Sequence, residues 1–486
     1  MRSRLCDIVI LLLLVVVTVM ATEPVRPLCS RGRHPEYMPA TSRSQGPRSC
    51  RVMEQKGVKR QLVFLVDFAD LSFRDEDPET VWRNIFNMEH FDQPPFHGSV
   101  HDYFYNQSFG QLDLEFDIHY VHMDKEYKEY RSGDIDAYDD TRSGLLLTEI
   151  LDMKKDEILD WSVYDWNGDG YINQVFILFA GKGQNNGGDK NTIWPHQWQL
   201  SSHADAPYNR EWGHPYVVTS DSIDFLVDNY AIFSERSRSD SESTFGTLCH
   251  EYSHCLGLPD FYYVATSYVG QWDIMDYGNY NASGYCPPGY SAMERYYLGW
   301  LDFKELTEEQ TIIGMGSISD GKEEAYLVRN DGYSNEFYVI ENRQQTGWDK
   351  SLPSSGIIIF HIDYDEDDWV SGTPNTPSRQ KYSIVHANNK KTQEGWPYPY
   401  EGNNELTNWS TPAAVVFHEN TDSTLFMNKP ITEMKVEGGL ASFRFMDSTA
   451  TVVERKMSQQ STVLYDFGPL YIIRNSQGEI KKVMKH

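Results

Sequence analysis

The sequence has few cysteines and few basic residues for its length. Only 6 cysteines occur among 486 residues, and so sparse a set does not make a disulfide scaffold. Lys and Arg number 43 against 71 Asp and Glu, which gives a formal net charge of -28 at pH 7. Nucleic acid and anionic membranes would repel a chain this acidic, so neither is expected as its main partner. Clustered carboxylates can instead bind calcium, or simply keep an exported protein soluble.

Long apolar runs are also scarce, and the one that stands out lies at the N-terminus. Arg2 and Arg4 precede an apolar segment over residues 8–20, and small residues follow around Ala21. This layout predicts a secretory signal peptide over residues 1–21, with an uncleaved anchor as the alternative. No comparable run follows. We therefore expect a secreted or cell-surface protein that is not stably inserted in a membrane after signal cleavage.

The rest of the chain divides into four parts by the texture of its sequence. Residues 22–58 are rich in Pro, Arg and Ser, which predicts a pro-segment or linker. Strand and helix patterns mix over residues 59–302 and predict an α/β domain. Short strand-like runs between Gly, Pro, Asn and Asp clusters predict a β-rich, sandwich-like domain over residues 303–447. Residues 448–486 form a tail that is either a remnant of a sorting domain or a plain β-hairpin.

Within the α/β part, the hydrophobic pattern identifies individual elements. The continuous apolar run at 61–68 predicts a buried strand, and the alternation at 112–118 predicts a half-buried one. Helical spacing occurs over 76–90 and 141–160, and a further strand is expected over 174–180.

A stretch with two histidines in the middle of the chain carries the clearest chemistry. His250 and His254 are four residues apart, so on a helix they share one face and can chelate one zinc ion. Glu251 lies beside them and is predicted to be the general base that takes a proton from zinc-bound water. Asp260 follows six residues after His254 and can supply a third ligand, which leaves a fourth position for water.

The helical interpretation of this stretch has its own support. An apolar stripe at helical spacing lies opposite the histidines. Its members are Phe245, Leu248, Cys249, Tyr252, Cys255 and Leu256. Gly257 is then expected to end the helix in a left-handed conformation.

A second motif, Trp-Asp-Ile-Met-Asp-Tyr-Gly, lies at residues 272–278. In metzincin proteases a methionine turn forms an apolar floor beneath the zinc histidines, and Met275 is placed for that role. Ordinary core packing is the alternative for Met275. Tyr277 resembles the tyrosine that some metzincins direct at the oxyanion, and we predict a catalytic role for it.

These segments together resemble the M6 family of metallopeptidases, of the immune inhibitor A type. The resemblance covers most of residues 58–447 and rests on segments that occur in the family's order. They include residues 63–68, 99–104, 106–110, 193–196, 250–260, 272–275, 298–300, 341–343 and 356–363. The resemblance implies a metzincin-like zinc protease fold. It implies the roles already reached from spacing, with His250, His254 and Asp260 as zinc ligands and Glu251 as base.

Residues 165–173 are predicted to bind structural calcium. Oxygen-bearing groups occur at alternate positions, as in a calcium loop. The predicted ligands are Asp165, Asn167, Asp169, Tyr171 and Asn173. The position that should be a bidentate Glu is Phe176, so the loop is incomplete and ligands would have to come from elsewhere. A bare Asx-Gly turn is the alternative.

The sequence therefore predicts a secreted zinc endopeptidase that hydrolyses peptide bonds in extracellular proteins, with catalytic Zn²⁺ and structural Ca²⁺. An extended peptide is expected to pair with an edge strand, for which residues 223–233 are the candidate. Two lone histidines, His196 and His361, could reach a cleft, although lone histidines are more often structural. An adhesion module on an inactive protease scaffold and a metal-dependent hydrolase of non-peptide bonds are the alternative functions.

Overall fold

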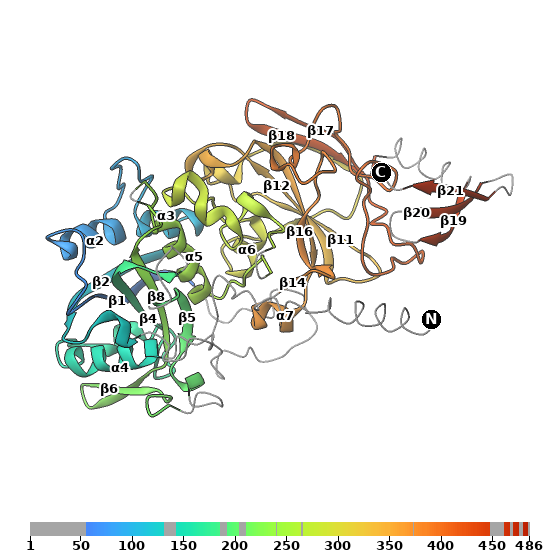
Figure 1. Ribbon diagram of the computed structural model, residues 1–486. Coiled ribbons are helices and arrows are strands. Elements are labelled where there is room, and N and C mark those ends of the chain that lie inside the picture. The colour runs from blue at the N-terminus through green and yellow to red at the C-terminus, as the bar shows by residue number, and fades with distance from the viewer. Residues whose placement is uncertain are drawn as a thin grey trace, which may run out of the picture.

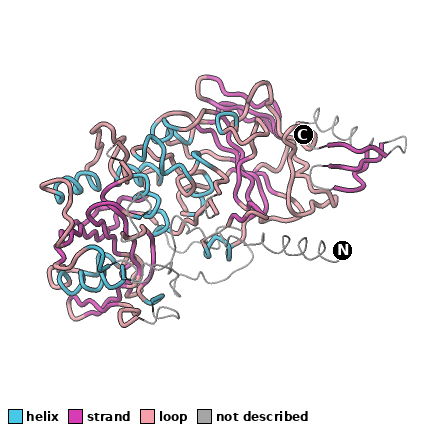
Figure 2. The backbone as a smooth tube through the Cα atoms, in the orientation of Figure 1, coloured by secondary structure: helices cyan, strands magenta, loops and turns pink. Residues whose placement is uncertain are grey.

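The computed structural model describes residues 55–130, 142–184, 192–203, 210–239, 241–263, 266–372 and 374–447, and the backbone of three C-terminal strands. Helices gather in the blue-to-yellow half of the molecule, whereas strands and loops dominate the orange half (Figures 1 and 2). The chain thus has a mixed α/β architecture with several sheets and few helices in its described part. This agrees with an α/β part followed by a β-rich part.

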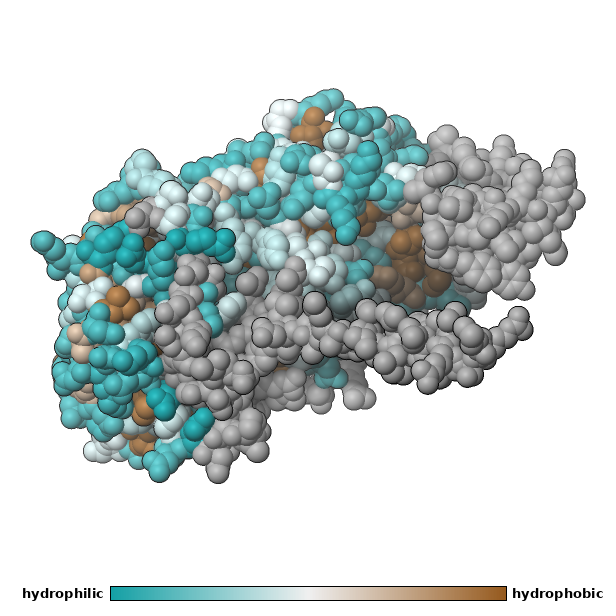
Figure 3. All heavy atoms as spheres, viewed as in Figure 1, coloured by the Kyte–Doolittle hydropathy of each residue, from teal (hydrophilic) through white to brown (hydrophobic). Residues whose placement is uncertain are grey.

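The predicted signal peptide, residues 1–21, and most of the predicted pro-segment lie outside the described residues. Among the residues that are described, no helix has the length and hydrophobicity needed to cross a membrane. Hydrophilic side chains cover most of the described surface in Figure 3, in keeping with the acidic composition.

A five-stranded sheet forms the frame of the α/β part, in the order β2-β1-β4-β8-β5. Its strands are β2 (Leu112–Met123), β1 (Gly57–Phe68), β4 (Val175–Lys182), β8 (Asn229–Arg236) and β5 (His196–Gln199). The first four run parallel, and β5 is antiparallel to β8.

Both faces of this sheet are buried. On β1, Leu62 and Phe64 belong to one hydrophobic core and Val63 and Leu65 to another. Helix α4 (Arg142–Lys154) contributes to the first core, and α5 (Phe245–Leu256) contributes to the second. A strand buried on both sides carries apolar residues at nearly every position, as residues 62–66 do. The run at 61–68 is therefore a buried strand, as predicted.

The predicted edge strand is not at an edge. Residues 223–227 form β7 (Ile223–Val227), which belongs to a separate sheet of β3 (Tyr171–Ile172), β7 and β6 (Tyr216–Ser220). The strand that follows, β8, pairs on both sides and lies inside the main sheet. The pairing that buries β8 joins it to β4 and β5, and such non-local partners leave no mark in a local pattern.

The β-rich part contains a second five-stranded sheet, in the order β16-β13-β12-β11-β9. Its strands are β16 (Tyr382–Ile384), β13 (Gly356–Asp363), β12 (Glu336–Arg343), β11 (Tyr326–Arg329) and β9 (Lys304–Glu305). A three-stranded sheet of β10 (Gln310–Met315), β18 (Leu440–Phe445) and β17 (Ile431–Glu437) lies nearby.

The second sheet is also buried on both faces. Along β12, Tyr338 and Ile340 pack in a core shared with the three-stranded sheet, whereas Phe337 and Val339 pack in the core that holds α5. One continuous hydrophobic core therefore joins residues on both sides of position 302. The domain boundary at 302/303 and the sandwich-like arrangement stay predictions.

The remaining α-helices in the described part of the chain are short. They are α2 (Pro78–Asn87), α3 (Val100–Gln107), α6 (Ala292–Tyr297) and α7 (Glu366–Ser371). Helix α2 lies within the predicted range 76–90. The helix predicted over 141–160 ends earlier, at Lys154, because buried Trp161 packs after the helix end and its indole N–H donates to the Lys155 carbonyl at 3.3 Å.

Five further strands lie among the described residues. They are the pair β14 (Asn375–Thr376) and β15 (Arg379–Gln380), and the antiparallel β19 (Ser461–Asp466), β20 (Leu470–Asn475) and β21 (Ile480–Met484). The last three lie in the predicted tail, whose sorting role stays a prediction.

Candidate metal centre

Helix α5 packs against β8 and β5 of the main sheet and carries both histidines. The apolar stripe of α5 packs in the hydrophobic core that also holds Val63 and Leu65 of β1, as predicted. Its members there include Phe245, Leu248, Tyr252 and Leu256. Gly257 has φ 111° and donates its N–H to the His254 carbonyl at 2.9 Å. This left-handed residue ends the helix as predicted and turns the chain back toward the histidine face.

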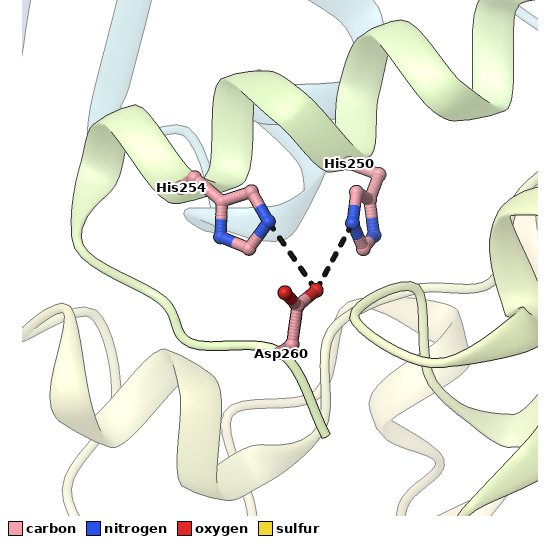
Figure 4. Close-up of side chains that lie close together, drawn as sticks. All are labelled: His250, His254 and Asp260. Atoms are coloured by element: carbon pink, nitrogen blue, oxygen red, sulfur yellow. Dashed lines mark ion pairs between the residues drawn. The ribbon is translucent and has the colours of Figure 1, made fainter. Parts of the chain in front are cut away.

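His250, His254 and Asp260 converge on one point. The Nε2 atoms of His250 and His254 each lie 3.3 Å from Oδ1 of Asp260. Figure 4 shows both imidazole rings on one side of α5, directed at the Asp260 carboxylate on the segment that follows. Among the described residues, this is the one cluster of three His, Cys, Asp or Glu side chains placed to share a metal ion.

Backbone carbonyls orient the two rings. His250 Nδ1 lies 2.7 Å from the Ile274 carbonyl oxygen, and His254 Nδ1 lies 2.8 Å from that of Leu258. A carbonyl oxygen only accepts, so each Nδ1 carries the proton and each Nε2 keeps its lone pair. Two imidazole nitrogens and one carboxylate oxygen are a donor set that zinc favours, with room for a further ligand. The residues thus fit a zinc ion.

Glu251 is buried beside these ligands. Its side chain is 1% exposed, and no described group hydrogen-bonds to Oε2. Burial raises the pKa of Glu251 to about 8, whereas the charge of a bound cation would act in the opposite direction. A carboxylate so little engaged in hydrogen bonds is suited to accept a proton.

The Met275 segment supports the centre through its backbone. Ile274 supplies the carbonyl that holds His250, and the Met275 carbonyl accepts the N–H of Phe261, the residue after Asp260, at 2.9 Å. The Met275 side chain is fully buried in the same hydrophobic core as α5. One turn thus holds one histidine and the segment that carries the carboxylate.

Comparison with known proteins identifies the region around this centre. The family model "Immune inhibitor A peptidase M6, catalytic domain" matches residues 50–300, a span of just over half of the chain. The chain belongs to the M6 peptidase family. This confirms the resemblance seen in the sequence.

Individual M6 relatives are distant in sequence. The chain is 25% identical over 311 residues to "Immune inhibitor A" of Bacillus thuringiensis subsp. alesti, a match that covers 52% of this chain and 42% of that protein. It is 22% identical over 315 residues to "Pre-pro-metalloprotease PrtV" of Vibrio cholerae serotype O1, covering 54% of this chain and 33% of that protein. The match therefore spans less than half the length of either relative.

Tyr277 lies near the candidate metal centre, next to Tyr262. Its ring centroid is 6.4 Å from that of Tyr262, and the Tyr262 ring lies 6.4 Å from His250 at an interplanar angle of 22°. The catalytic role of Tyr277 stays a prediction. Tyr262 was missed by the sequence analysis, because an aromatic residue after Asp260 has no distinctive spacing.

The predicted calcium loop is closed by its own hydrogen bonds. Asp165 Oδ1 accepts the N–H groups of Gly168 and Asp169 at 2.9 and 3.2 Å, and Asp165 Oδ2 accepts that of Gly170 at 2.9 Å. Asn173 Oδ1 accepts the N–H of Trp166 at 2.5 Å. These are the bonds of Asx turns, the alternative interpretation, and calcium binding by Asp165, Asn167, Asp169, Tyr171 and Asn173 stays a prediction.

The lone histidines take part in other buried contacts. His196 on β5 lies 2.6 Å through Nδ1 from the Trp194 carbonyl and 3.1 Å through Nε2 from Ser143 Oγ. His361 on β13 lies 2.7 Å through Nε2 from Glu336 Oε1. Neither belongs to the metal-binding cluster.

Proposed function

We propose that this chain is a secreted zinc endopeptidase that hydrolyses peptide bonds in extracellular proteins. The observation that carries the proposal is the convergence of the His250 and His254 Nε2 atoms on Asp260 Oδ1, beside the buried Glu251 carboxylate. The matched M6 catalytic domain contains all four residues. Secretion rests on the sequence of residues 1–21.

The chemistry divides between a metal ion and the protein. A zinc ion held by the three ligands would supply Lewis acidity, which polarises a peptide carbonyl and makes water easier to deprotonate. Glu251 takes the proton of the attacking water and returns it to the leaving amine. Tyr277 is proposed to stabilise the negative charge that develops on the carbonyl oxygen.

The substrate is proposed to bind along β5 in place of the predicted segment 223–233. Strand β5 lies at the edge of the main sheet and packs against α5. An extended peptide can add to such an edge through main-chain hydrogen bonds. That position would bring a peptide carbonyl toward the histidine face of α5.

The decisive experiment compares two variants of the metal centre in a casein or quenched-peptide assay. Glu251→Gln keeps the shape of the side chain and all three ligands, so it should retain one zinc while kcat falls at least about 100-fold. His254→Ala removes a ligand, so it should lose both zinc and activity. Zinc content is measured by atomic spectroscopy, and a chelator should abolish wild-type cleavage.

Other outcomes would favour the alternative functions. A wild-type protein that holds one zinc and cleaves no peptide bond in any substrate tested would point to a binding module on a protease scaffold. Zinc-dependent hydrolysis of ester or non-peptide amide substrates alone would point to a different hydrolase. Cleavage that survives in Glu251→Gln would exclude Glu251 as the general base.

A further inference from the structure

The metal-binding residues lie on α5 and on two segments that need support from elsewhere. Asp260 lies on the segment after Gly257, and the turn at 273–276 holds His250 through the Ile274 carbonyl. The Asp260 segment and the turn contact each other through Phe261 and Met275. Neither is a regular helix or strand, so their positions depend on what packs against them.

Tyr382, at the start of β16 in the second sheet, contacts both segments. Its ring stacks on that of Phe261 with centroids 3.7 Å apart and an interplanar angle of 11°. Its hydroxyl donates to Asp273 Oδ2 at 2.8 Å and also lies 2.8 Å from Ser291 Oγ. Tyr382, Phe261 and Asp273 are all fully buried.

Asp273 connects Tyr382 to the turn that orients His250. Its Oδ1 accepts the N–H of Met275 at 2.8 Å, which fixes the turn that presents the Ile274 carbonyl to His250. A hydrogen-bonded path therefore runs from Tyr382 through Asp273 and the turn to His250. The stacked Tyr382 ring also holds Phe261, the residue directly after Asp260.

A second side chain of the β-rich part reinforces the same place. Asn375 donates through Nδ2 to the Phe261 carbonyl at 2.8 Å and to the Tyr382 carbonyl at 2.7 Å, and its Oδ1 accepts the Tyr382 N–H at 2.8 Å. Asn375 is also fully buried. It joins the Phe261 backbone to β16 directly.

We propose that Tyr382 is a positioning residue of the metal centre. Through it, the β-rich part of the chain sets the zinc affinity of the α/β part, which is called the protease part below. This inference rests on the proposed zinc site. Tyr382 and Asn375 both lie beyond residues 50–300, the span of the matched catalytic domain. Groups that orient metal ligands from behind typically change metal affinity 10- to 100-fold when they are removed, and about 10-fold is expected here.

The test compares Tyr382→Phe with Tyr338→Phe in the full chain. Tyr382→Phe keeps the stacked ring and removes only the hydroxyl. Tyr338, on β12 of the same sheet, donates its buried hydroxyl to the Val415 carbonyl at 2.6 Å, and its ring packs in the core remote from α5. Both variants remove only a buried hydroxyl, which has two polar contacts in Tyr382 and one in Tyr338, but only the Tyr382 hydroxyl lies behind the metal centre.

Zinc dissociation constants are measured by competition with a chromophoric chelator. Tyr382→Phe should bind zinc about 10-fold more weakly than the wild type, and Tyr338→Phe should bind it with unchanged affinity. The visible spectrum of the Co²⁺-loaded protein should change in Tyr382→Phe alone, because it reports ligand geometry. If Tyr382→Phe does not fold, Phe261→Leu tests the stacking contact and should weaken zinc binding in the same way.

Three results would overturn the inference. Zinc affinity and Co²⁺ spectra equal to wild type in Tyr382→Phe, or in Phe261→Leu where the first variant does not fold, would show that the β-rich part does not position the ligands. An equal loss of zinc affinity in Tyr338→Phe would assign the effect to general destabilisation. A wild-type protein without zinc would refute the proposed function itself, a failure distinguishable from the other two.

Discussion

Glu336 is a fully buried carboxylate at the start of β12, remote from the metal centre in sequence. His361 Nε2 lies 2.7 Å from Oε1, and the backbone N–H groups of Phe417 and His418 donate to Oε1 and Oε2 at 2.5 and 2.9 Å. Burial raises the pKa of Glu336, but the bonds from His361 and the two N–H groups outweigh it and lower the pKa to about 2.

This lowered pKa predicts an acid-sensitive contribution to stability. A depressed carboxyl pKa stabilises the fold above the unfolded value of 4.5, and the contribution is lost as pH falls toward 2. This lowering of the pKa means that the Glu336 carboxylate contributes on the order of 3 kcal/mol to the free energy of unfolding. Glu336→Gln should therefore unfold at lower urea concentration than wild type at pH 7, and the gap between the two should narrow at pH 3. If the urea midpoints of Glu336→Gln and wild type differ equally at pH 7 and pH 3, this explanation is wrong.

For individual residues, the sequence predicts a site well when its members lie close together in the chain. His250, Glu251, His254 and Asp260 lie within one helix and the turn after it, so their spacing alone brings the three predicted ligands together. Tyr382 and Asp273 are 109 positions apart, and no periodicity links them. Their contact depends on how the second sheet packs against the α/β part.

Helix α5 itself is fitted tightly at its second residue, Gly246. A Cβ atom at Gly246 would lie 1.9 Å from the Asn279 carbonyl oxygen, a contact that no side-chain rotation relieves. Asn279 belongs to the 3-10 segment η8 (Tyr277–Gly284), in which Ala282 and Ser283 have left-handed conformations. Close approach of η8 therefore requires glycine here.

Gly246→Ala is predicted to destabilise the protein despite the greater helix propensity of alanine. The overpacking should lower the free energy of unfolding by about 1–3 kcal/mol, measured by denaturant unfolding. Gly144→Ala in α4 is the matched comparison, because the atoms nearest to its Cβ belong to the side chain of His203, at 2.8 Å, rather than to backbone. It should cost less, and an equal cost in both helices would argue against a special role for the η8 contact.

The positions of helices and strands can be predicted where the burial of residues adjacent in the chain leaves a regular hydrophobic pattern. The strand at 61–68 and the end of α5 at Gly257 follow from local pattern and local backbone preference. The order of strands does not, since β1 pairs with residues 112–123 and 175–179. The wrong assignment of 223–233 to an edge has this cause.

On the scale of the whole molecule, the protease part and the β-rich part share one hydrophobic core. Val339, Ile358 and Phe360 of the second sheet lie in the same buried cluster as Leu248 and Tyr252 of α5. A chain cut at residue 302 would expose this surface to water at a cost of about 25 cal/mol per Å² of apolar area.

We therefore predict that residues 55–447 unfold together. Urea unfolding followed by tryptophan fluorescence and by far-ultraviolet circular dichroism should give one coincident transition. A fragment of residues 55–302 should lack a cooperative transition and bind a dye for exposed apolar surface. Two separate transitions in the full chain, or a cooperatively folded fragment, would establish independent domains with the predicted boundary.

The contact of Tyr382 with Phe261 and Asp273 also bears on biogenesis. A chain is synthesised from its N-terminus, so its N-terminal parts leave the ribosome first. All three predicted metal ligands leave the ribosome before residue 382 does, so a nascent chain carries them without the residue proposed to position them. Under the proposed positioning role, full metal affinity would be reached only after residue 382 has been synthesised, and this delay would limit premature proteolysis inside the producing cell.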